Sequence, residues 1–455
     1  MSKSHRFTYS AGRLRDFASA VLAHAARLGA SACECDVSEG YGLSVTVRKG
    51  SVDTLEHNRD KGIGVTVYLG ERPHARRGHA STSDFSAAAL EQTVAAALAI
   101  ARYTAEDDCA GPPEPHLLAR EFPDLDLFHP WDLTTEQAIE TARRCEAAAF
   151  GLSPKLKNSE GASLSSQHSQ FVFANSLGFM GGFPTSRHSL WCSVIAEDKG
   201  LMQRDDWYSA ARVPGRLADA VALGRYAGER ALARLGARKI TTRKAPVLFE
   251  APVATQLIGA FVSAASGGNL YRKASFLVDG LGKQVFSPIV TIEEEPLVRQ
   301  ALASSPFDEE GVATRPRLVV RDGVLQGYFL GCYSARKLGL QSTGSAGGHH
   351  NLSVRQVGRG PAPDFVGMLK VLGTGLLVTE LMGQGVNLIT GDYSRGAAGY
   401  WVEGGEIRYP VEEITIAGNL KEMLRGIAAV GGDVVVRGAR RSGSILVDNM
   451  TIAGD

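Results

Sequence analysis

Hydrophobic and polar positions alternate between two periods along the first part of the chain. Residues 12–29 repeat apolar side chains at helical spacing, and Gly29 stands where a helix commonly ends. Residues 31–82 alternate apolar and polar positions, interrupted by glycine and aspartate, which predicts a run of antiparallel strands. A second helix is predicted over 84–103. This order of helix, strands and helix favours a sheet with helices on one face.

The same order of elements recurs after a connector. Residues 105–130 hold one glycine and five prolines between charged residues, a composition typical of a linking segment. The elements predicted beyond it are a helix at 134–151 with a capping-box start, strands at 160–177, 186–197 and 200–210, and a helix at 215–236. This second unit resembles the first in its order of elements, although no sequence identity is strong enough to define a repeat.

The main boundary is predicted at 236–246, which is charged and lacks a hydrophobic period. Beyond it come a strand at 246–250, a helix at 251–266, a hairpin at 316–330 around Asp322-Gly323, further strands and a tight turn at Gly404-Gly405. We therefore expect an α+β fold, with helix-plus-antiparallel-sheet units followed by a glycine-rich, mainly antiparallel β domain with a few helices. The expected domains are 1–240, built from units of about 1–110 and 130–240, and 241–455.

Glycine is the unusual feature of the composition. The chain has 52 glycines in 455 residues, and 32 of them follow residue 240. Between Gly339 and Gly405 there are 16. Such a concentration indicates many unusual backbone angles or close backbone approaches in the C-terminal half.

Charge and targeting signals narrow the function classes. The 49 basic and 48 acidic side chains give a formal charge of +1, so no global field favours DNA or an anionic membrane. No apolar run is long enough for a transmembrane helix, and the N-terminus lacks the apolar core of a signal peptide. Six scattered cysteines are too few for a disulfide framework. These features favour a cytoplasmic protein with reduced thiols.

The common catalytic motifs are missing from the sequence. It has no Walker A motif, no complete G-x-G-x-x-G, no G-x-S-x-G and no H-E-x-x-H or H-E-x-x-x-H. Ser334-Ala-Arg-Lys337 matches S-x-x-K without its companion motifs, and we interpret it as a helix carrying a surface lysine. We interpret Cys33-x-Cys35 as a core-facing pair and His349-His350 as part of a loop.

Three longer segments resemble a known family. SAASGGNLYRKASFLVDGLGKQVFSP at 263–288, the run at 307–352 and VTELMGQGVNLITGDYSRGAAGYWVEGGEIRYPVEEITIAGNL at 378–420 resemble the TldD/PmbA family, specifically its PmbA (TldE) branch. These runs are far more specific than four-residue motifs. The N-terminal half is compatible with the family in length and pattern.

The resemblance implies one half of a two-chain protease. TldD-type subunits resemble zinc metalloproteases in which two histidines of an H-E-x-x-x-H helix and a C-terminal cysteine hold the metal. PmbA-type subunits share the fold and pair with TldD. The family is associated with maturation of a peptide antibiotic, degradation of an antitoxin and modulation of DNA gyrase, so the resemblance implies a peptide substrate and a TldD-like partner.

The resemblance also implies that the metal ligands are absent from this chain. With Arg272-Lys273 as the anchor, the ligand and base positions fall near Gly259, Ala260 and Ala264. Residues 251–268 contain no His, Glu, Asp or Cys, and 440–449 has Ser and Gly where TldD has Cys. We therefore expect no catalytic residue and no metal in this chain, with zinc in the TldD-like partner.

Peptide and partner contacts are predicted elsewhere in the matched segments. A glycine-rich strand accepts an extended peptide through main-chain hydrogen bonds, and Gly383-Gln384-Gly385 is the candidate edge. Alternatively these glycines serve only bulges and turns. The charged residues of the matched segments contact partner or substrate, or else fix the sheet by ion pairs; they are Arg272, Lys273, Asp279, Glu380, Asp392 and Arg395.

Two alternative functions stay open at this point. An independent metallopeptidase with an unconventional site would draw its ligands from Glu293-Glu294-Glu295, Glu380, Asp392 and His349-His350. A regulatory binding protein without proteolysis is the other alternative, and neutral charge argues against direct nucleic-acid binding. A homodimer in the absence of the partner also stays open.

Overall fold

The structure is a computed structural model that describes residues 7–358 and 360–454. Its helices and mostly antiparallel sheets confirm the predicted α+β class. The N-terminal segment, for which the sequence predicts no signal peptide, begins with residues 1–6, which lie outside the described residues. No described helix is both long enough and apolar enough to cross a membrane.

The N-terminal part is one sheet in the order β3-β2-β1-β4-β6-β7, with the short β5 paired to β4. Its elements are α1 (Ala11–Arg27), β1 (Ala32–Arg48), β2 (Ser51–Leu69), β3 (Arg76–Thr82), α2 (Ala87–Tyr103), α3 (Thr135–Phe150), β4 (Leu156–Asn175), β5 (Met180–Gly181), β6 (Pro184–Asp198), β7 (Leu201–Ala211) and α4 (Ala220–Ala233). Each half of the sheet therefore begins and ends with a helix, and the halves join where β1 pairs antiparallel with β4.

Glycines inside the alternating run do not end its strands. Gly40 and Gly42 lie within the 17-residue β1, and 31–82 forms two long strands followed by a short one. A Cβ at Gly42 would lie 1.9 Å from Oε1 of Gln167 on β4. Glycine at this position makes room for a side chain across the strand pair.

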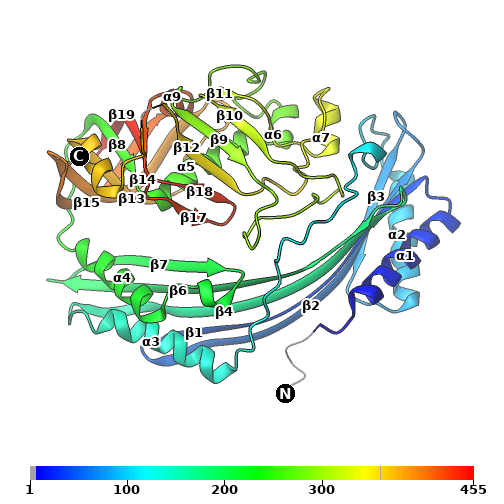
Figure 1. The fold of residues 1–455 in the computed structure, drawn as a ribbon, viewed down its shortest axis with the longest axis horizontal. Coiled ribbons are helices and arrows are strands. Elements are labelled where there is room, and N and C mark those ends of the chain that lie inside the picture. Colours follow the sequence, from blue (N-terminus) through cyan, green and yellow to red (C-terminus); the bar gives the residue numbers. More distant parts are fainter. Residues whose placement is uncertain (1–6, 359, 455) are drawn as a thin grey trace.

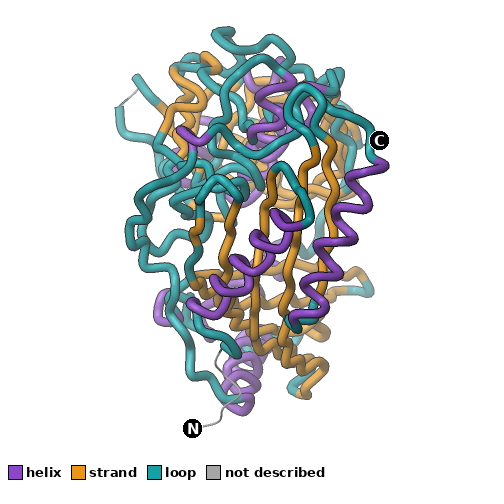
Figure 2. Tube along the Cα trace, turned by 90° about the vertical axis from the view of Figure 1, so that its right-hand side faces the viewer, coloured by secondary structure: helices purple, strands orange, loops and turns teal. Residues whose placement is uncertain are grey.

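All four N-terminal helices cover the same face of the sheet. On β1, Cys33, Cys35 and Val37 pack in one apolar cluster with α1 and α2, whereas Leu43 and Val45 pack in another with α3 and α4. These are odd-numbered positions, which share one face of a strand. Figures 1 and 2 show helices lying across the long strands, and the prediction of helices on one face is confirmed.

The C-terminal part forms two six-stranded sheets. Its elements are β8 (Arg243–Phe249), α5 (Ala251–Ala264), α6 (Gly267–Tyr271), β9 (Val290–Glu294), β10 (Arg317–Arg321), β11 (Val324–Leu325), α7 (Cys332–Lys337), β12 (Leu352–Gln356), α8 (Phe365–Leu372), β13 (Gly375–Met382), β14 (Asp392–Glu403), β15 (Glu406–Asn419), α9 (Leu420–Arg425), β16 (Ile427–Val430), β17 (Val435–Arg437), β18 (Arg440–Ser442) and β19 (Ile445–Ala453). Because β15 also pairs with β19, strands β15, β14, β13, β8 and β19 close into a ring.

Strand direction in this half is mainly antiparallel, with two parallel pairs that the sequence did not indicate. These are β8 with β13 and β12 with β18. The predicted turns are present, since Asp322 and Gly323 have φ of 49° and 79°, and Gly404 and Gly405 have φ of 61° and 78°. The boundary at 236–246 falls between the N-terminal sheet and β8, and the division into domains stays a prediction.

The glycine concentration has the expected physical cause. Of the 16 glycines from Gly339 to Gly405, 11 have positive φ. Others lie against backbone: a Cβ at Gly399 would be 1.9 Å from the Leu377 carbonyl oxygen across β13 and β14. Both unusual angles and close approaches therefore account for the composition.

The C-terminal half lies over the concave face of the long sheet (Figure 1). That face carries the even-numbered residues of β1, including Glu34, Asp36 and Ser38, which line a cavity together with Asp308 and Glu310. The polar face of the sheet is thus turned toward the second half of the chain rather than toward bulk solvent.

The sheet packs closely against α2 at Gly78 on β3. A Cβ there would lie 2.0 Å from the Ala97 carbonyl oxygen and 2.6 Å from the Ala101 nitrogen. We expect Gly78→Ala to lower the free energy of unfolding by about 1–3 kcal/mol, because α2 must shift. Urea unfolding measures this loss.

Gly62 on β2 is the matched control, because no heavy atom lies within 4 Å of its added Cβ. We expect Gly62→Ala to leave the stability unchanged or raised by less than about 1 kcal/mol. Equal losses in the two variants would contradict the packing argument.

Candidate functional site

Helix α5 is the element to which the family resemblance assigns the metal. It is apolar, and Val253, Leu257, Ile258 and Phe261 are buried in the large C-terminal core. The packing of this buried side holds the helix, and Pro252 stands in its first turn. Of the three predicted metal-helix positions, Ala264 is fully buried, whereas Ala260 packs partly buried against the core.

A guanidinium occupies the space beside the third of these positions, Gly259. A Cβ there would lie 1.8 Å from Arg440 Nη1. Arg440 comes from β18, and its Nη1 donates to the Thr255 carbonyl oxygen over 2.9 Å. No side chain larger than glycine's hydrogen fits at 259 while the arginine stays in place.

The donors around α5 do not match those that zinc prefers. Zinc in proteins is bound by Cys, His, Asp or Glu, and 251–268 contains none of them. In the C-terminal segment, Ser442 donates to the Gly443 carbonyl and Ser444 donates to Asp433. The charged group that lies against Gly259 is the cation Arg440, which opposes a metal ion by charge repulsion.

The charged candidates of the matched segments make intramolecular contacts. Glu380 on β13 forms an ion pair with Arg234 of α4. Arg395 on β14 donates to Gln256 of α5 over 3.1 Å. Asp392 is exposed and accepts from Thr390 and Asn419. Their predicted roles in partner or substrate contact stay predictions.

Arg272, Lys273 and Asp279 lie in the segment after α6. Arg272 and Lys273 are exposed, and the Arg272 guanidinium lies 5.5 Å from the centre of the Tyr271 ring. Lys273 and Asp279 both have φ of 56°. The structure thus presents the Arg272-Lys273 pair to solvent at the end of α6.

The candidate peptide edge Gly383-Gln384-Gly385 follows β13. Gly383 has a φ of 76°, and the Gly385 carbonyl accepts from the Ser394 nitrogen over 2.7 Å. A Cβ at Gly385 would lie 1.7 Å from the Ser394 carbonyl oxygen. The segment is therefore bonded to β14 of its own hairpin at Gly385, and its role in peptide binding stays a prediction.

The residues of the alternative metal site are distributed over separate contacts. The His350 amide donates to Glu294 over 2.7 Å, and the same carboxylate pairs with Arg317 over 2.6 Å. Glu293 pairs with Arg355. Burial lowers the pKa of His349 to about 4, aided by the nearby charge of Arg440, so its imidazole is neutral.

An ion-pair network that the sequence analysis missed joins the two halves. Arg230 of α4 contacts Asp205 of β7 over 3.0 Å and holds Glu250, the residue preceding α5, at 2.7 and 3.1 Å. Arg234, one helical turn later, pairs with Asp205 and Glu380. The i, i+4 spacing of two arginines on one helix was the available signal.

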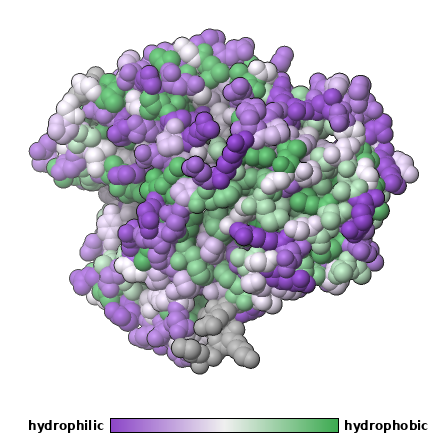
Figure 3. Space-filling view, turned by 45° about the vertical axis from the view of Figure 1, so that its right-hand side comes forward, coloured by the Kyte–Doolittle hydropathy of each residue, from purple (hydrophilic) through white to green (hydrophobic). Residues whose placement is uncertain are grey.

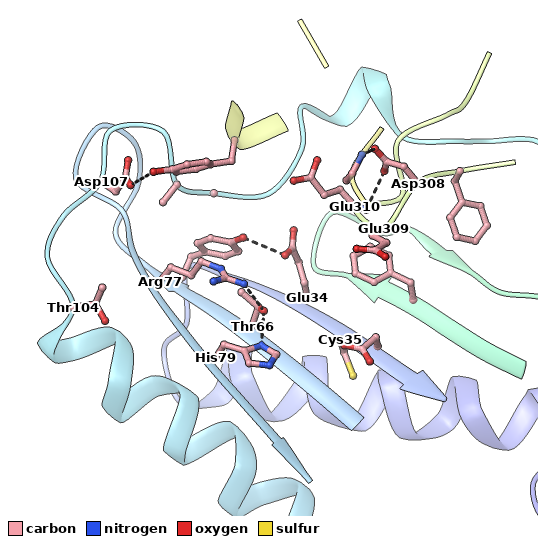
Figure 4. A pocket seen from close by; sticks show the side chains of 18 of the residues that line it. Glu34, Cys35, Thr66, Arg77, His79, Thr104, Asp107, Asp308, Glu309 and Glu310 are labelled. Carbon is pink, nitrogen blue, oxygen red and sulfur yellow. Dashed lines mark hydrogen bonds between the residues drawn. The ribbon is translucent and has the colours of Figure 1, made fainter. Parts of the chain in front are cut away.

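A cavity of 1140 Å³ lies between the concave face of the sheet and the C-terminal half (Figure 4). Tyr68 donates to Glu34 over 3.1 Å, and the Thr66 hydroxyl and His79 Nδ1 are 3.0 Å apart. Carboxylates outnumber the cationic side chains in its lining, which includes Glu34, Asp36, Glu106, Asp107, Asp308, Glu309 and Glu310 beside Arg77 and His79.

Two of these carboxyl groups are hard to ionise. Burial, followed by the charge of Glu310, raises the pKa of Glu34 to about 7 against the opposing hydrogen bond from Tyr68. Burial also raises the pKa of Asp308 to about 7, although three backbone amides donate to its carboxylate. Near neutral pH each of these two carboxyl groups is therefore partly protonated.

The S-x-x-K pair lies on α7, beside this cavity. Lys337 forms ion pairs with Asp107 at 2.9 Å and Asp108 at 2.8 Å, and these hydrogen bonds raise the pKa of Lys337. A lysine that acts as a general base needs a lowered pKa. The interpretation of Ser334-Ala-Arg-Lys337 as a lysine-bearing helix therefore fits the structure.

Comparison with known proteins identifies three family models along the chain. They are PmbA/TldA metallopeptidase domain 1 at residues 33–101, the central domain at 128–235 and the C-terminal domain at 242–454. The chain is 50% identical over 421 residues to metalloprotease PmbA of Escherichia coli O157:H7, covering 92% of each chain.

Two solved structures share the fold. A candidate modulator of DNA gyrase from Bacteroides thetaiotaomicron aligns with a TM-score of 0.90 at 25% identity, covering 97% of this chain and 99% of that one. TldE from Thermococcus kodakarensis aligns with a TM-score of 0.82 at 18% identity, covering 96% of this chain and all of that one.

Removing the central cation tests the ion-pair network. Arg230→Met keeps much of the side-chain volume but leaves Asp205 and Glu250 without their main partner. We expect the free energy of unfolding to fall by about 3–5 kcal/mol. In contrast, Lys155→Met breaks an exposed pair with Asp198 and is expected to cost less than about 1 kcal/mol. Similar small losses in both variants would refute the structural importance of the network.

The raised pKa of Glu34 gives a pH-dependent stability. Its carboxyl binds a proton more tightly in the folded chain than its ordinary pKa of 4.5 allows in the unfolded chain, so stability falls as pH rises from about 4.5 to 7. We expect Glu34→Gln to stabilise the protein by about 1–3 kcal/mol at pH 8 and to flatten this fall.

Denaturant unfolding at several pH values between 5 and 8 measures this effect. Glu309→Gln is the control, because Glu309 lines the same cavity but is exposed. If both variants show the same dependence of stability on pH as the unaltered chain, the raised pKa of Glu34 does not cause the loss of stability.

Proposed function

This chain belongs to the PmbA/TldA metallopeptidase family, and we propose that it is the PmbA (TldE)-type subunit of a two-chain metalloprotease, with the zinc site in a TldD-like partner. In this role the chain holds no zinc and supplies no catalytic residue. It completes the assembly and helps to hold the peptide substrate.

The observation that carries the proposal is the chemistry of α5. Where a metal-bearing relative would place histidines and a glutamate, this helix has only apolar, amide and hydroxyl side chains, and Arg440 lies against Gly259. A zinc ion that activates water typically needs three protein ligands to bring the pKa of that water near about 7. The arrangement here supports a retained scaffold without the metal.

The surface supports an interaction with another chain. Several large apolar side chains are exposed, including Leu201 and Met202 at the start of the edge strand β7 and Ile389 in the loop before β14. Figure 3 shows hydrophobic side chains gathered in a band across the middle of one face. A contiguous apolar band such as the one in Figure 3 commonly marks a protein interface.

The remaining assignments rest on the same family relation. We place the assembly in the cytoplasm, with peptide processing and proteolysis as its activity, including peptide antibiotic maturation, antitoxin degradation and gyrase modulation. The three matched ranges support boundaries near residues 110 to 130 and near 240. Gly383-Gln384-Gly385 and the exposed pair Arg272-Lys273 are the proposed contacts with peptide or partner.

A reconstitution experiment tests the subunit model. This chain and a TldD-type protein from the same cell are purified separately, and each is assayed alone and together for cleavage of an unstructured peptide such as casein. We expect cleavage only in the mixture, and co-elution of the two chains from a sizing column.

The control replaces the two histidines of the partner's H-E-x-x-x-H motif, which should abolish cleavage without affecting co-elution. Cleavage by this chain alone, retained after treatment with a chelator and a second purification, would refute the model. Failure of the two chains to associate would also refute it.

A further inference from the structure

A second cavity, of 460 Å³, lies beside α5 on the side facing the N-terminal sheet. β7 contributes Trp207 and Tyr208, α5 contributes Thr255 and Gln256, and the turn between β17 and β18 contributes Gly438. The cavity is thus bounded by the edge strand of one half of the chain and by the helix that carries the altered metal positions.

The charges that line this cavity are predominantly positive. The lining contains six arginines and three carboxylates. The arginines are Arg187, Arg204, Arg230, Arg234, Arg437 and Arg440, and the carboxylates are Asp205, Asp206 and Glu380. Three of the arginines are neutralised by ion pairs, because Arg204 pairs with Glu160 and Asp206, and Arg230 and Arg234 belong to the network described above. Within residues 7–358 and 360–454, no ion pair with a carboxylate engages Arg187, Arg437 or Arg440.

Arg440 has hydrogen-bonding capacity left over. Its Nη1 is used by the Thr255 carbonyl, but its Nε is shielded from solvent and has no partner among the described residues. Thr379 lines the same cavity, and its buried hydroxyl likewise has no partner within the described part of the chain. Buried donors are rarely left unpaired, so these atoms indicate a missing acceptor.

Arg437 is held in place beside it. Its guanidinium lies 4.0 Å from the centre of the Tyr208 ring and 4.5 Å from that of Trp207, and its Nη1 donates to the Tyr208 carbonyl. Burial lowers the pKa of both Arg437 and Arg440, which means that their charges are under-compensated. Pro252 and Val253, in the first turn of α5, add the partial positive charge of a helix N-terminus.

We propose that this cavity binds a carboxylate group of the peptide that the assembly processes, with Arg440 as the main contact and Arg437 and Arg187 as supporting cations. The planar guanidinium fork matches the two oxygens of a carboxylate. The inference rests on the proposed function for the presence of a peptide. The carboxylate belongs either to the C-terminus of the peptide or to an Asp or Glu side chain.

Three probe peptides distinguish these sources. All share one N-acetylated sequence of ten uncharged residues: the first ends in a free carboxylate, the second in an amide, and the third ends in an amide and carries one central glutamate. Calorimetric titration of the full-length chain, alone and in its complex, measures their affinities. We expect the first or the third to bind at least about tenfold more tightly than the second. Equal affinities for all three overturn the proposal.

Variants of two arginines in the same cavity localise the effect. Arg440→Gln is expected to reduce the affinity for the favoured carboxylate peptide by about 10- to 100-fold, down to that of the amidated peptide. Arg204→Gln is the matched control, because Arg204 is engaged by Glu160 and Asp206, and we expect a change of less than about twofold. Equal losses in both variants overturn the role of Arg440.

If Arg440→Gln does not fold, Arg187→Gln takes its place, because Arg187 is exposed on β6. A several-fold loss of carboxylate preference supports the proposal, and an unchanged preference overturns it. The binding assay needs no cleavage. If the mixture cleaves peptide but binding shows no carboxylate preference, this inference is wrong and the proposed function stands. If the chain prefers carboxylate peptides but the mixture does not cleave, the proposed function is wrong and the carboxylate site stands.

Discussion

The buried ion pairs around Arg230 hold the two halves of the chain in one arrangement. Arg230 and Arg234 extend from α4, while their partners lie on β7, at the end of β8 and on β13. Removing these charged side chains from water costs free energy, and the cost is offset only while every arginine stays paired with its carboxylates. The network therefore acts as an all-or-none contact between the edge of the N-terminal sheet and the strand ring. The cavity beside α5 derives one of its walls from this contact.

That fixed arrangement keeps α5 in place within a fold of the PmbA/TldA metallopeptidase family. The buried apolar side of α5 packs in the large C-terminal core next to the strand ring. At Gly259 the space is filled by the guanidinium of Arg440, which donates hydrogen bonds and repels a metal ion. The acidic cavity over β1 and β2 and the basic cavity beside β7 lie near opposite edges of the same curved sheet.

Much of the fold followed from local patterns in the sequence. Period-two alternation identified the strands of the N-terminal sheet, and the helices start and end within a few residues of the predicted positions, because caps such as Thr134 with Gln137 are local. The ring closure of β15 on β19 and the parallel pairs were not predictable, because they depend on contacts between distant segments. The glycine count indicated close backbone approach but not which pairs of strands approach.

The candidate sites also combine features that the local sequence predicts with features that depend on contacts between distant segments. The sequence showed which residue types were missing from α5, yet gave no sign that Arg440 takes the space, because 259 and 440 are far apart along the chain. The network around Arg230 and the cavity lined by Glu34 and Asp308 likewise depend on tertiary contacts. Glu380 was singled out for its charge, and the structure shows its intramolecular partner, Arg234.

The central claim is that zinc belongs to the partner and not to this chain. The most direct test is metal analysis of this chain alone, of the TldD-like partner alone and of their complex, each equilibrated with zinc and then passed through a desalting column. The account predicts about one zinc ion per complex and per partner, and no stoichiometric zinc in this chain. One tightly held zinc ion in this chain alone would contradict it.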